Sequence, residues 1–261
     1  MMHGFCFECV SHSFPNMKRC LFIAALCSNA VFAAEANLAI QPVPRDAGWV
    51  KRHESFNEVS KKGEAALVFL GDSITQGWSG KGKSVWDKMY VSRKAVNFGI
   101  GGDRTEHVLW RLANGNFNGL SPKLIVLMIG TNNTGHVGRP QKELKDAIYH
   151  CTAEETAQGV TQIVETLKKK CPTSKILLLG IFPRGETPAD LKRQQNEATN
   201  ALIAKLADGI SVQYLDLATN FLQADGTLTR EIAPDLLHLS EVGYQKWADA
   251  IEPKIKDLLG N

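Results

Sequence analysis

The chain has 261 residues, of which 44% are hydrophobic and 22% are charged, a composition that excludes a disordered or fibrous protein and suits one globular domain. Its 30 basic and 27 acidic residues give a formal net charge of +3, and no long basic block indicates nucleic acid as a partner. The longest basic run, Lys168-Lys169-Lys170, ends a helix-like segment, where cations complement the helix dipole.

Residues 1–33 are interpreted as a leader that does not belong to the fold. From Met17 the chain shows a basic start, an apolar run and small residues up to Ala33, which is the pattern of a secretory signal peptide. Residues 1–16 precede this signal, so we interpret Met17 as the true start. No later apolar run approaches the ~20 residues of a membrane span. We therefore expect a secreted or periplasmic protein with no stable membrane insertion.

The cysteines divide between the leader and the mature chain. Four of the six fall in the leader, which leaves Cys151 and Cys171. These two flank a helix-like segment, and they could form a disulfide in an oxidising compartment if the fold brought them close together. The sequence leaves this pairing open.

After a polar lead-in over residues 34–64, apolar runs alternate with amphipathic segments over residues 65–261. The apolar runs have the length and composition of strands covered on both faces: residues 65–70, 95–100, 124–129, 175–181 and 212–217. The amphipathic segments have helical spacing: residues 105–112, 153–170, 191–207 and 240–259. This alternation predicts a three-layer, flavodoxin-like α/β/α domain around a five-stranded parallel sheet.

One connection is longer than usual for a strand-to-helix loop. Residues 136–151 follow the end of the third strand, at the sheet edge where open α/β sheets build their sites. One interpretation is a rim or partial lid over a pocket. The other is a solvated insertion with a short helix at 141–149. Both interpretations stay open.

Candidate catalytic residues follow the first three strands. Ser73 comes directly after the first, in Gly71-Asp72-Ser73, although Asp-Ser pairs are also common helix caps. Gly102 follows the second, in a glycine-rich loop that does not complete a dinucleotide fingerprint, and Asn132 follows the third. Backbone N–H groups of Ser73 and Gly102, with the Asn132 side chain, would together form an oxyanion hole.

A carboxylate stands three residues before an imidazole ahead of the last helix. At this spacing Asp235 can accept a hydrogen bond from Nδ1–H of His238, which leaves Nε2 to take the proton of Ser73. Serine needs such a base, because its hydroxyl is a poor nucleophile at neutral pH. The alternative for His238 is a capping role beside Ser240.

Together these blocks resemble the SGNH hydrolase superfamily, named for a serine, a glycine, an asparagine and a histidine in this chain order. The segments NFGIGGDRTEHVLWRL, GTNNTGH, FPRGE and DLLHLSEVGY look most like the catalytic subunits of intracellular platelet-activating-factor acetylhydrolases and their bacterial relatives. The resemblance implies Ser73 as nucleophile, Asp235 and His238 as its partners, and Gly102 and Asn132 as oxyanion donors. The leader and the insertion after Gly135 depart from it.

The expected function is hydrolysis of short-chain acyl esters, above all acetyl esters of carbohydrates such as xylan, through an acyl-enzyme. The alternatives are a lysophospholipase or platelet-activating-factor type of lipid esterase, an O-acyltransferase and a non-hydrolytic carbohydrate-binding protein. Serine chemistry needs no cofactor, and the histidines have no partners at metal-ligand spacing, so we expect neither a cofactor nor a metal. The oligomeric state stays open.

Two further residues are candidates for substrate binding. Trp78 follows the nucleophile and would either form an apolar wall of the site or belong to the core. Arg184 follows the fourth strand at the same sheet edge, where it would either meet an anionic substrate group or form a salt bridge.

Overall fold

The structure of the protein is a computed structural model that describes residues 36–260, so the predicted leader over 1–33 lies outside the described residues. Five parallel strands form the central sheet in the order β2-β1-β3-β6-β7. They are β1 (Leu67–Gly71), β2 (Ala95–Gly99), β3 (Leu124–Met128), β6 (Lys175–Leu179) and β7 (Val212–Leu215). This order confirms the predicted five-stranded parallel sheet. The apolar runs that the sequence shows provide its strands.

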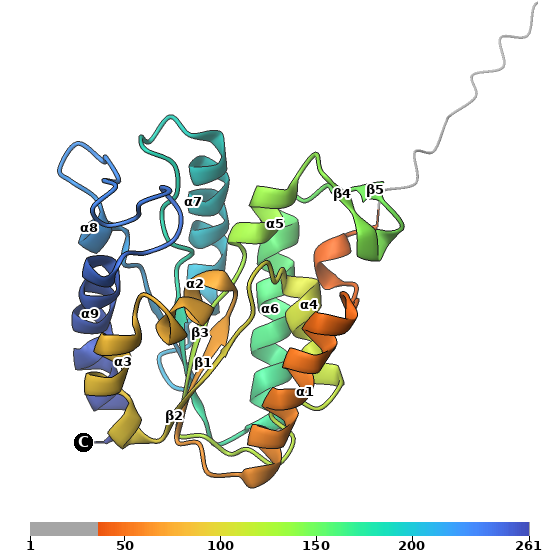
Figure 1. Cartoon of the computed structure of the whole chain (residues 1–261), viewed down its shortest axis with the longest axis vertical. Coiled ribbons are helices and arrows are strands. Elements are labelled where there is room, and N and C mark those ends of the chain that lie inside the picture. The colour runs from red at the N-terminus through yellow and green to blue at the C-terminus, as the bar shows by residue number, and fades with distance from the viewer. Residues whose placement is uncertain (1–35, 261) are drawn as a thin grey trace, which may run out of the picture. The chain divides into compact units, whose positions relative to one another are not determined.

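Helices cover both faces of the sheet (Figure 1). One face carries α1 (Ala47–Lys62), α4 (Thr105–Ala113), α6 (Ala153–Lys170) and α7 (Leu191–Ile203). The other carries α3 (Lys83–Met89), α8 (Ala218–Phe221) and α9 (Glu241–Leu259). Alternate residues of β1 enter the two cores, with Val68 in one and Phe69 in the other. The predicted three-layer domain is confirmed.

Short elements link these layers. Two short α-helices follow strands at the sheet edge, α2 (Ser73–Gln76) and α5 (Thr131–His136). Turns of 3-10 helix occur at η1 (Leu38–Ile40), η2 (Gly77–Ser79), η3 (Val91–Arg93), η4 (Lys142–Leu144) and η5 (Ala204–Leu206). The segment predicted as one helix over 191–207 is α7 followed by the 3-10 turn η5, and the helix predicted over 240–259 is α9 with Ser240 as its N-cap.

The lead-in is part of the domain and not a separate segment. The Asp46 side chain caps α1 by accepting a hydrogen bond from the Trp49 N–H, and the helix buries residues 49, 53, 56 and 60 against the sheet. From Ala36 onward the described chain forms one compact unit. No helix among residues 36–260 is long and apolar enough to cross a membrane.

The insertion forms a small antiparallel hairpin of β4 (Pro140–Gln141) and β5 (Ala147–Ile148). Of the short helix predicted at 141–149, only the single 3-10 turn η4 forms, between the two strands of the hairpin. The backbone of Lys145 and Asp146 has positive φ values of 57° and 61°, and two consecutive left-handed residues end a helix and form a hairpin turn.

Arg104 anchors this hairpin to the rest of the domain. Its fully buried guanidinium pairs with Glu143 of the insertion at 2.5 Å, binds Gln141 at 2.6 Å, and lies 4.3 Å from the Tyr149 ring centroid. Because these contacts are buried and charge-assisted, they hold the insertion beside the start of α4. Arg104 directly follows the glycine-rich loop after β2, so the hairpin stands next to that loop.

The two mature cysteines are free and buried. Cys151 precedes α6 and Cys171 caps its other end, so a helix of 18 residues separates them. Such a helix is ~27 Å long, far beyond the ~7 Å between Cα atoms that a disulfide can bridge. The sequence had left this pairing open, and the structure contradicts it.

Candidate active site

The predicted site residues meet at the carboxyl end of the sheet. In the sheet Gly71, the last residue of β1, pairs with Gly99 of β2 on one side and with Met128 of β3 on the other. The chain turns from one side of β1 to the other at this point, which is where open α/β sheets form their sites. The loops after these three strands therefore share one edge.

Ser73, His238 and Asp235 are linked by hydrogen bonds. Ser73 Oγ lies 2.9 Å from His238 Nε2, and His238 Nδ1 lies 2.7 Å from Asp235 Oδ2. The second carboxylate oxygen of Asp235 accepts the backbone N–H groups of His238 at 2.7 Å and of Leu237 at 3.1 Å. Asp235 thus fixes both the ring and the loop that carries it. The structure brings together the three residues that the sequence singled out.

The electrostatics keep Asp235 ionised. Partial burial raises the pKa of this carboxyl, but hydrogen bonds from the His238 ring and from the backbone outweigh it, and the net pKa lies below its usual value. A carboxylate in this position accepts a proton-bearing Nδ1, which leaves the lone pair of Nε2 facing the serine hydroxyl.

Two contacts fix the short helix that begins with Ser73. The Tyr244 hydroxyl, from α9, donates to the carbonyl oxygen of Ile74 at 2.6 Å. The Gln76 side-chain oxygen accepts the N–H of Gly101 at 2.6 Å, which ties α2 to the glycine-rich loop. The nucleophile candidate therefore sits on an element held from two sides.

The two further oxyanion candidates lie in the segments that follow the strands on either side of β1. Gly102 has φ +78°, which favours glycine, and a Cβ there would lie 3.1 Å from Arg45 Nη1. Asn132 is buried, and its side-chain nitrogen donates to the carbonyl oxygen of Asp103 at 2.9 Å. Among residues 36–260 no acceptor takes its second amide hydrogen. Asn133, by contrast, accepts the backbone N–H of Thr105 and has a structural role.

Three arginines that the sequence analysis did not single out hold the glycine-rich loop from behind. Arg45 donates to the carbonyl oxygen of Gly101 at 2.7 Å, Arg52 to that of Gly99 at 3.1 Å, and Arg111 to that of Phe98 at 2.6 Å. These guanidinium groups place positive charge next to the end of β2 and the loop that follows it, and positive charge there would favour a developing oxyanion. The helical spacing of residues 49, 53, 56 and 60 in the sequence could have predicted α1. It could not have predicted the contacts of the three arginines.

A buried carboxylate balances part of this charge. Asp103 is fully buried, pairs with Arg111 at 2.7 Å and accepts the indole N–H of Trp49 at 2.6 Å. Arg45 lies 3.5 Å from its other oxygen. One carboxylate therefore faces more than one guanidinium, and the surroundings of the loop stay net positive.

The interpretation of Trp78 as a wall of the site was wrong. Its side chain has no exposed surface, and its ring packs 4.7 Å from Tyr244 and 4.8 Å from Trp247, measured between centroids. Trp78 lies in η2, and its ring belongs to the core between the sheet and α9.

Arg184 lies at the site edge without the salt bridge that was one of its two expected roles. Its guanidinium donates to the carbonyl oxygen of Thr131 at 2.9 Å, and no salt bridge to it occurs among the described residues. It lines an open pocket of about 550 Å³ together with Asp190, Lys192 and Asp235. Within residues 36–260 no cluster of side chains could hold a metal ion.

The sequence pattern of the GDSL-like lipase/acylhydrolase family matches residues 69–246, more than half of the chain. The chain belongs to this family. The human platelet-activating factor acetylhydrolase IB subunit alpha1 is 34% identical over 220 residues, covering 84% of this chain and 88% of the relative. The rat alpha2 subunit is 34% identical over 221 residues, covering 85% and 89%. The predicted SGNH/GDSL membership is confirmed.

A solved structure shares the fold. Axe2, an acetylxylan esterase from Geobacillus stearothermophilus, superposes with a TM-score of 0.57 at 20% identity, covering 76% of this chain and 97% of Axe2. As a member of the acylhydrolase family, the chain is a carboxylic ester hydrolase, as the sequence predicted.

Asp72, beside the serine of this acylhydrolase, carries a buried and half-satisfied carboxyl. Its Oδ1 accepts the N–H of Ile74 at 2.9 Å, whereas Oδ2 has no partner among the described residues. Burial raises its pKa from 3.8 to about 7. At a pH between these two values, Asp72 keeps its proton in the folded protein and loses it in the unfolded chain. Rising pH therefore destabilises the fold through this window.

We expect Asp72→Asn to remove this dependence, because the amide oxygen can still cap Ile74 and no charge is left to bury. The free energy of unfolding of the variant minus that of the wild type should increase from about pH 4 to about pH 7 and then level off. Urea unfolding of both proteins across this range measures the difference. A difference that does not vary with pH would contradict the assignment.

Proposed function

We propose that the protein hydrolyses acetyl and other short-chain acyl esters of carbohydrates through an acyl-enzyme on Ser73. The supporting observation is the hydrogen-bonded line from Ser73 through His238 to Asp235, with Gly102 and Asn132 following the two neighbouring strands at the same sheet edge. In an acylhydrolase these groups match the roles of nucleophile, base, orienting acid and oxyanion donors. We further propose, from the predicted leader, that the enzyme acts outside the cytoplasm.

The first half-reaction forms the acyl-enzyme. His238 Nε2 takes the proton of Ser73 as Oγ attacks the ester carbonyl carbon, and the resulting oxyanion accepts hydrogen bonds from the Ser73 and Gly102 N–H groups and the Asn132 amide. Asp235 stabilises the imidazolium that forms. The intermediate collapses as His238 returns the proton to the departing alkoxide, which leaves as the alcohol.

The second half-reaction releases the acid. A water molecule gives a proton to His238 Nε2 as its oxygen attacks the acyl carbon, and a second tetrahedral intermediate forms in the same oxyanion hole. Breakdown of this intermediate returns the proton to Ser73 Oγ and frees the carboxylic acid. Transfer of the acyl group to a sugar hydroxyl would share the same acyl-enzyme, and product analysis with added alcohol acceptors separates the two outcomes.

The surroundings of the site suit a hydroxyl-rich alcohol better than a lipid chain. The pocket beside Asp235 includes the charged residues Arg184, Asp190 and Lys192. A second pocket, beside the glycine-rich loop, includes Arg45, Asp46, Lys142 and Glu143. Charged and polar linings bind hydroxyl groups by hydrogen bonds and disfavour long apolar tails. The acetylxylan esterase activity named for Axe2 supports the same substrate class.

The second candidate substrate is a phospholipid acetyl ester, favoured by the names of the acetylhydrolase relatives. Two assays distinguish the candidates: acetate release from acetylated xylan, and hydrolysis of p-nitrophenyl esters of increasing chain length. We expect acetate release from xylan, and a kcat/KM that falls beyond short acyl chains. Activity confined to long-chain or phospholipid esters would overturn the carbohydrate proposal.

A further inference from the structure

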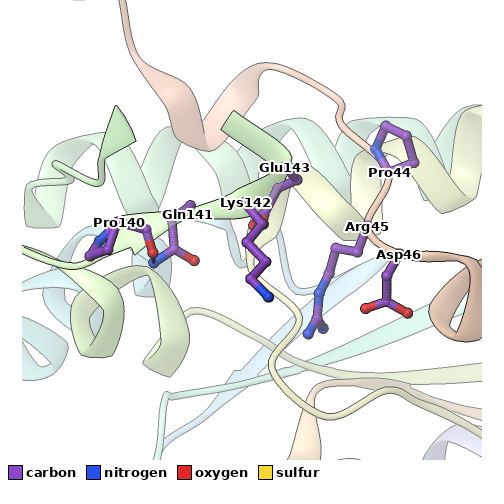
Figure 2. A pocket seen from close by; sticks show the side chains of 7 residues that line it. All are labelled: Pro44, Arg45, Asp46, Pro140, Gln141, Lys142 and Glu143. Carbon is purple, nitrogen blue, oxygen red and sulfur yellow. Dashed lines mark hydrogen bonds between the residues drawn. The ribbon is translucent and has the colours of Figure 1, made fainter. Parts of the chain in front are cut away.

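A pocket of about 430 Å³ opens between the lead-in and the insertion, lined by residues 44–46 and 140–143. We name it the rim pocket. Figure 2 shows Arg45 and Lys142 extending into the same space from its two walls. Lys142 takes no part in the chemistry proposed above, and Arg45 acts there only through the backbone of the glycine-rich loop.

The rim pocket adjoins the proposed oxyanion loop. Arg45 Nη1 donates to the carbonyl oxygen of Gly101 at 2.7 Å, and a Cβ on Gly102 would lie 3.2 Å from Arg45 Nη2. A Cβ on Gly101 would in turn lie 3.7 Å from the Ser73 Cβ. One residue of the loop thus separates the Arg45 guanidinium from the nucleophile, and the alcohol portion of a substrate on Ser73 has to extend past this residue to reach the pocket.

The pocket is lined by two anions and two cations, and the anions are the more fully engaged. The anion Glu143 is bound by Arg104 and His107, and Asp46 caps α1. Lys142 has no hydrogen-bond or ion-pair partner among the described residues, and its side chain is exposed. Arg45 uses Nη1 alone, which donates to Gly101 and lies 3.5 Å from Asp103, a carboxylate that it shares with Arg111.

Two cations therefore face the pocket with bonding capacity to spare. The free edge of the Arg45 guanidinium, Nη2 and Nε, matches the geometry of a carboxylate, and the Lys142 ammonium adds a point charge. An acetyl group carries no ionisable atom, so an anion bound here must belong to the alcohol portion of the ester.

We propose that the rim pocket binds a carboxylate on the alcohol portion, so that the preferred substrates are acetylated acidic sugars such as uronic acids. This inference rests on the proposed acetyl esterase function. Arg45 and Lys142 are its binding residues, and the insertion over residues 136–151 exists on this view to supply one wall of the pocket.

The test compares two substrates that differ in one charge, the O-acetylated methyl glucuronoside and its neutral carboxamide. Acetate release gives kcat/KM for each, and the ratio of acid to amide is the readout. We expect the wild type to prefer the acid, and Lys142→Gln to lower the ratio about three- to tenfold. Lys142→Glu should lower it further, and Arg45→Gln should lower it as well.

Lys145→Gln is the matched control, because Lys145 is an exposed lysine of the same hairpin that does not line the pocket. Its ratio should stay at the wild-type value, and raising the salt concentration should lower the wild-type ratio. The rim-pocket proposal is overturned if the wild type shows no preference for the acid, or if all variants have the same acid-to-amide ratio, while acetate is still released. Failure of the proposed esterase function would give a different result, namely no Ser73-dependent acetate release from either substrate.

Discussion

Alanine at position 73 is expected to lower kcat/KM for acetyl ester hydrolysis by roughly 10⁴-fold or more. Ser73 Oγ is the atom that His238 Nε2 reaches at 2.9 Å, and without it no acyl-enzyme can form. The change removes one partly buried hydroxyl, so the thermal unfolding midpoint should stay close to that of the wild type. Initial rates with p-nitrophenyl acetate, after subtraction of the uncatalysed rate, measure the loss.

A fluorophosphonate probe gives a second readout that is independent of turnover. It should label the wild type at Ser73 and leave the alanine variant unlabelled. Ser55→Ala is the matched control, since Ser55 is an exposed serine on α1 whose hydroxyl donates to its own helix. Equal hydrolysis by wild type and Ser73→Ala would refute the assigned nucleophile.

The largest expected effect on stability comes from Arg111→Met. Arg111 and Asp103 are both fully buried and pair at 2.7 Å, and the same guanidinium also binds Asn116 and the Phe98 carbonyl oxygen. Methionine fills similar volume but leaves the Asp103 carboxylate without its main partner. We expect the free energy of unfolding to fall by ~3–5 kcal/mol, measured by urea titration.

The companion variants test whether the stranded charge is the cause. Asp103→Asn in the Arg111→Met background removes that charge, so the double variant should be more stable than Arg111→Met alone. Lys83→Met breaks an exposed ion pair with Asp87 and should leave the urea midpoint nearly unchanged. If Arg111→Met also left the midpoint unchanged, the pair would not contribute to the fold.

The sheet and the residues at its edge could be predicted because each depends on local sequence. Near-continuous apolar runs mark strands covered on both faces, and parallel strands bring their carboxyl ends to one edge. Ser73, Gly102 and Asn132 directly follow such strands, so their meeting at one edge followed from topology. The spacing of Asp235 and His238 also follows from local geometry, because one turn of chain joins them.

Other features depend on contacts between distant segments, which the sequence does not display. The role of Arg45 needs α1 to be placed against the loop after β2, 56 residues further along the chain. The insertion adopts a hairpin because two residues take left-handed backbone conformations and Arg104 binds it from outside. Trp78 follows the nucleophile in sequence but points into the opposite core layer, a direction that proximity alone does not give.

The bracing of the proposed oxyanion loop by Arg52 of α1, and by Arg45 just before this helix, links the activity of the enzyme to a segment that contributes no atom to the proposed reaction. Opening of α1 would release the carbonyl oxygens of Gly99 and Gly101 while the hydrogen bonds among Ser73, His238 and Asp235 persist. We therefore expect a protease that cuts within residues 36–62 to lower the activity while Ser73, His238 and Asp235 stay intact. A shortened chain that starts at β1 would lack Arg45 and Arg52, and we expect it to have the same low activity.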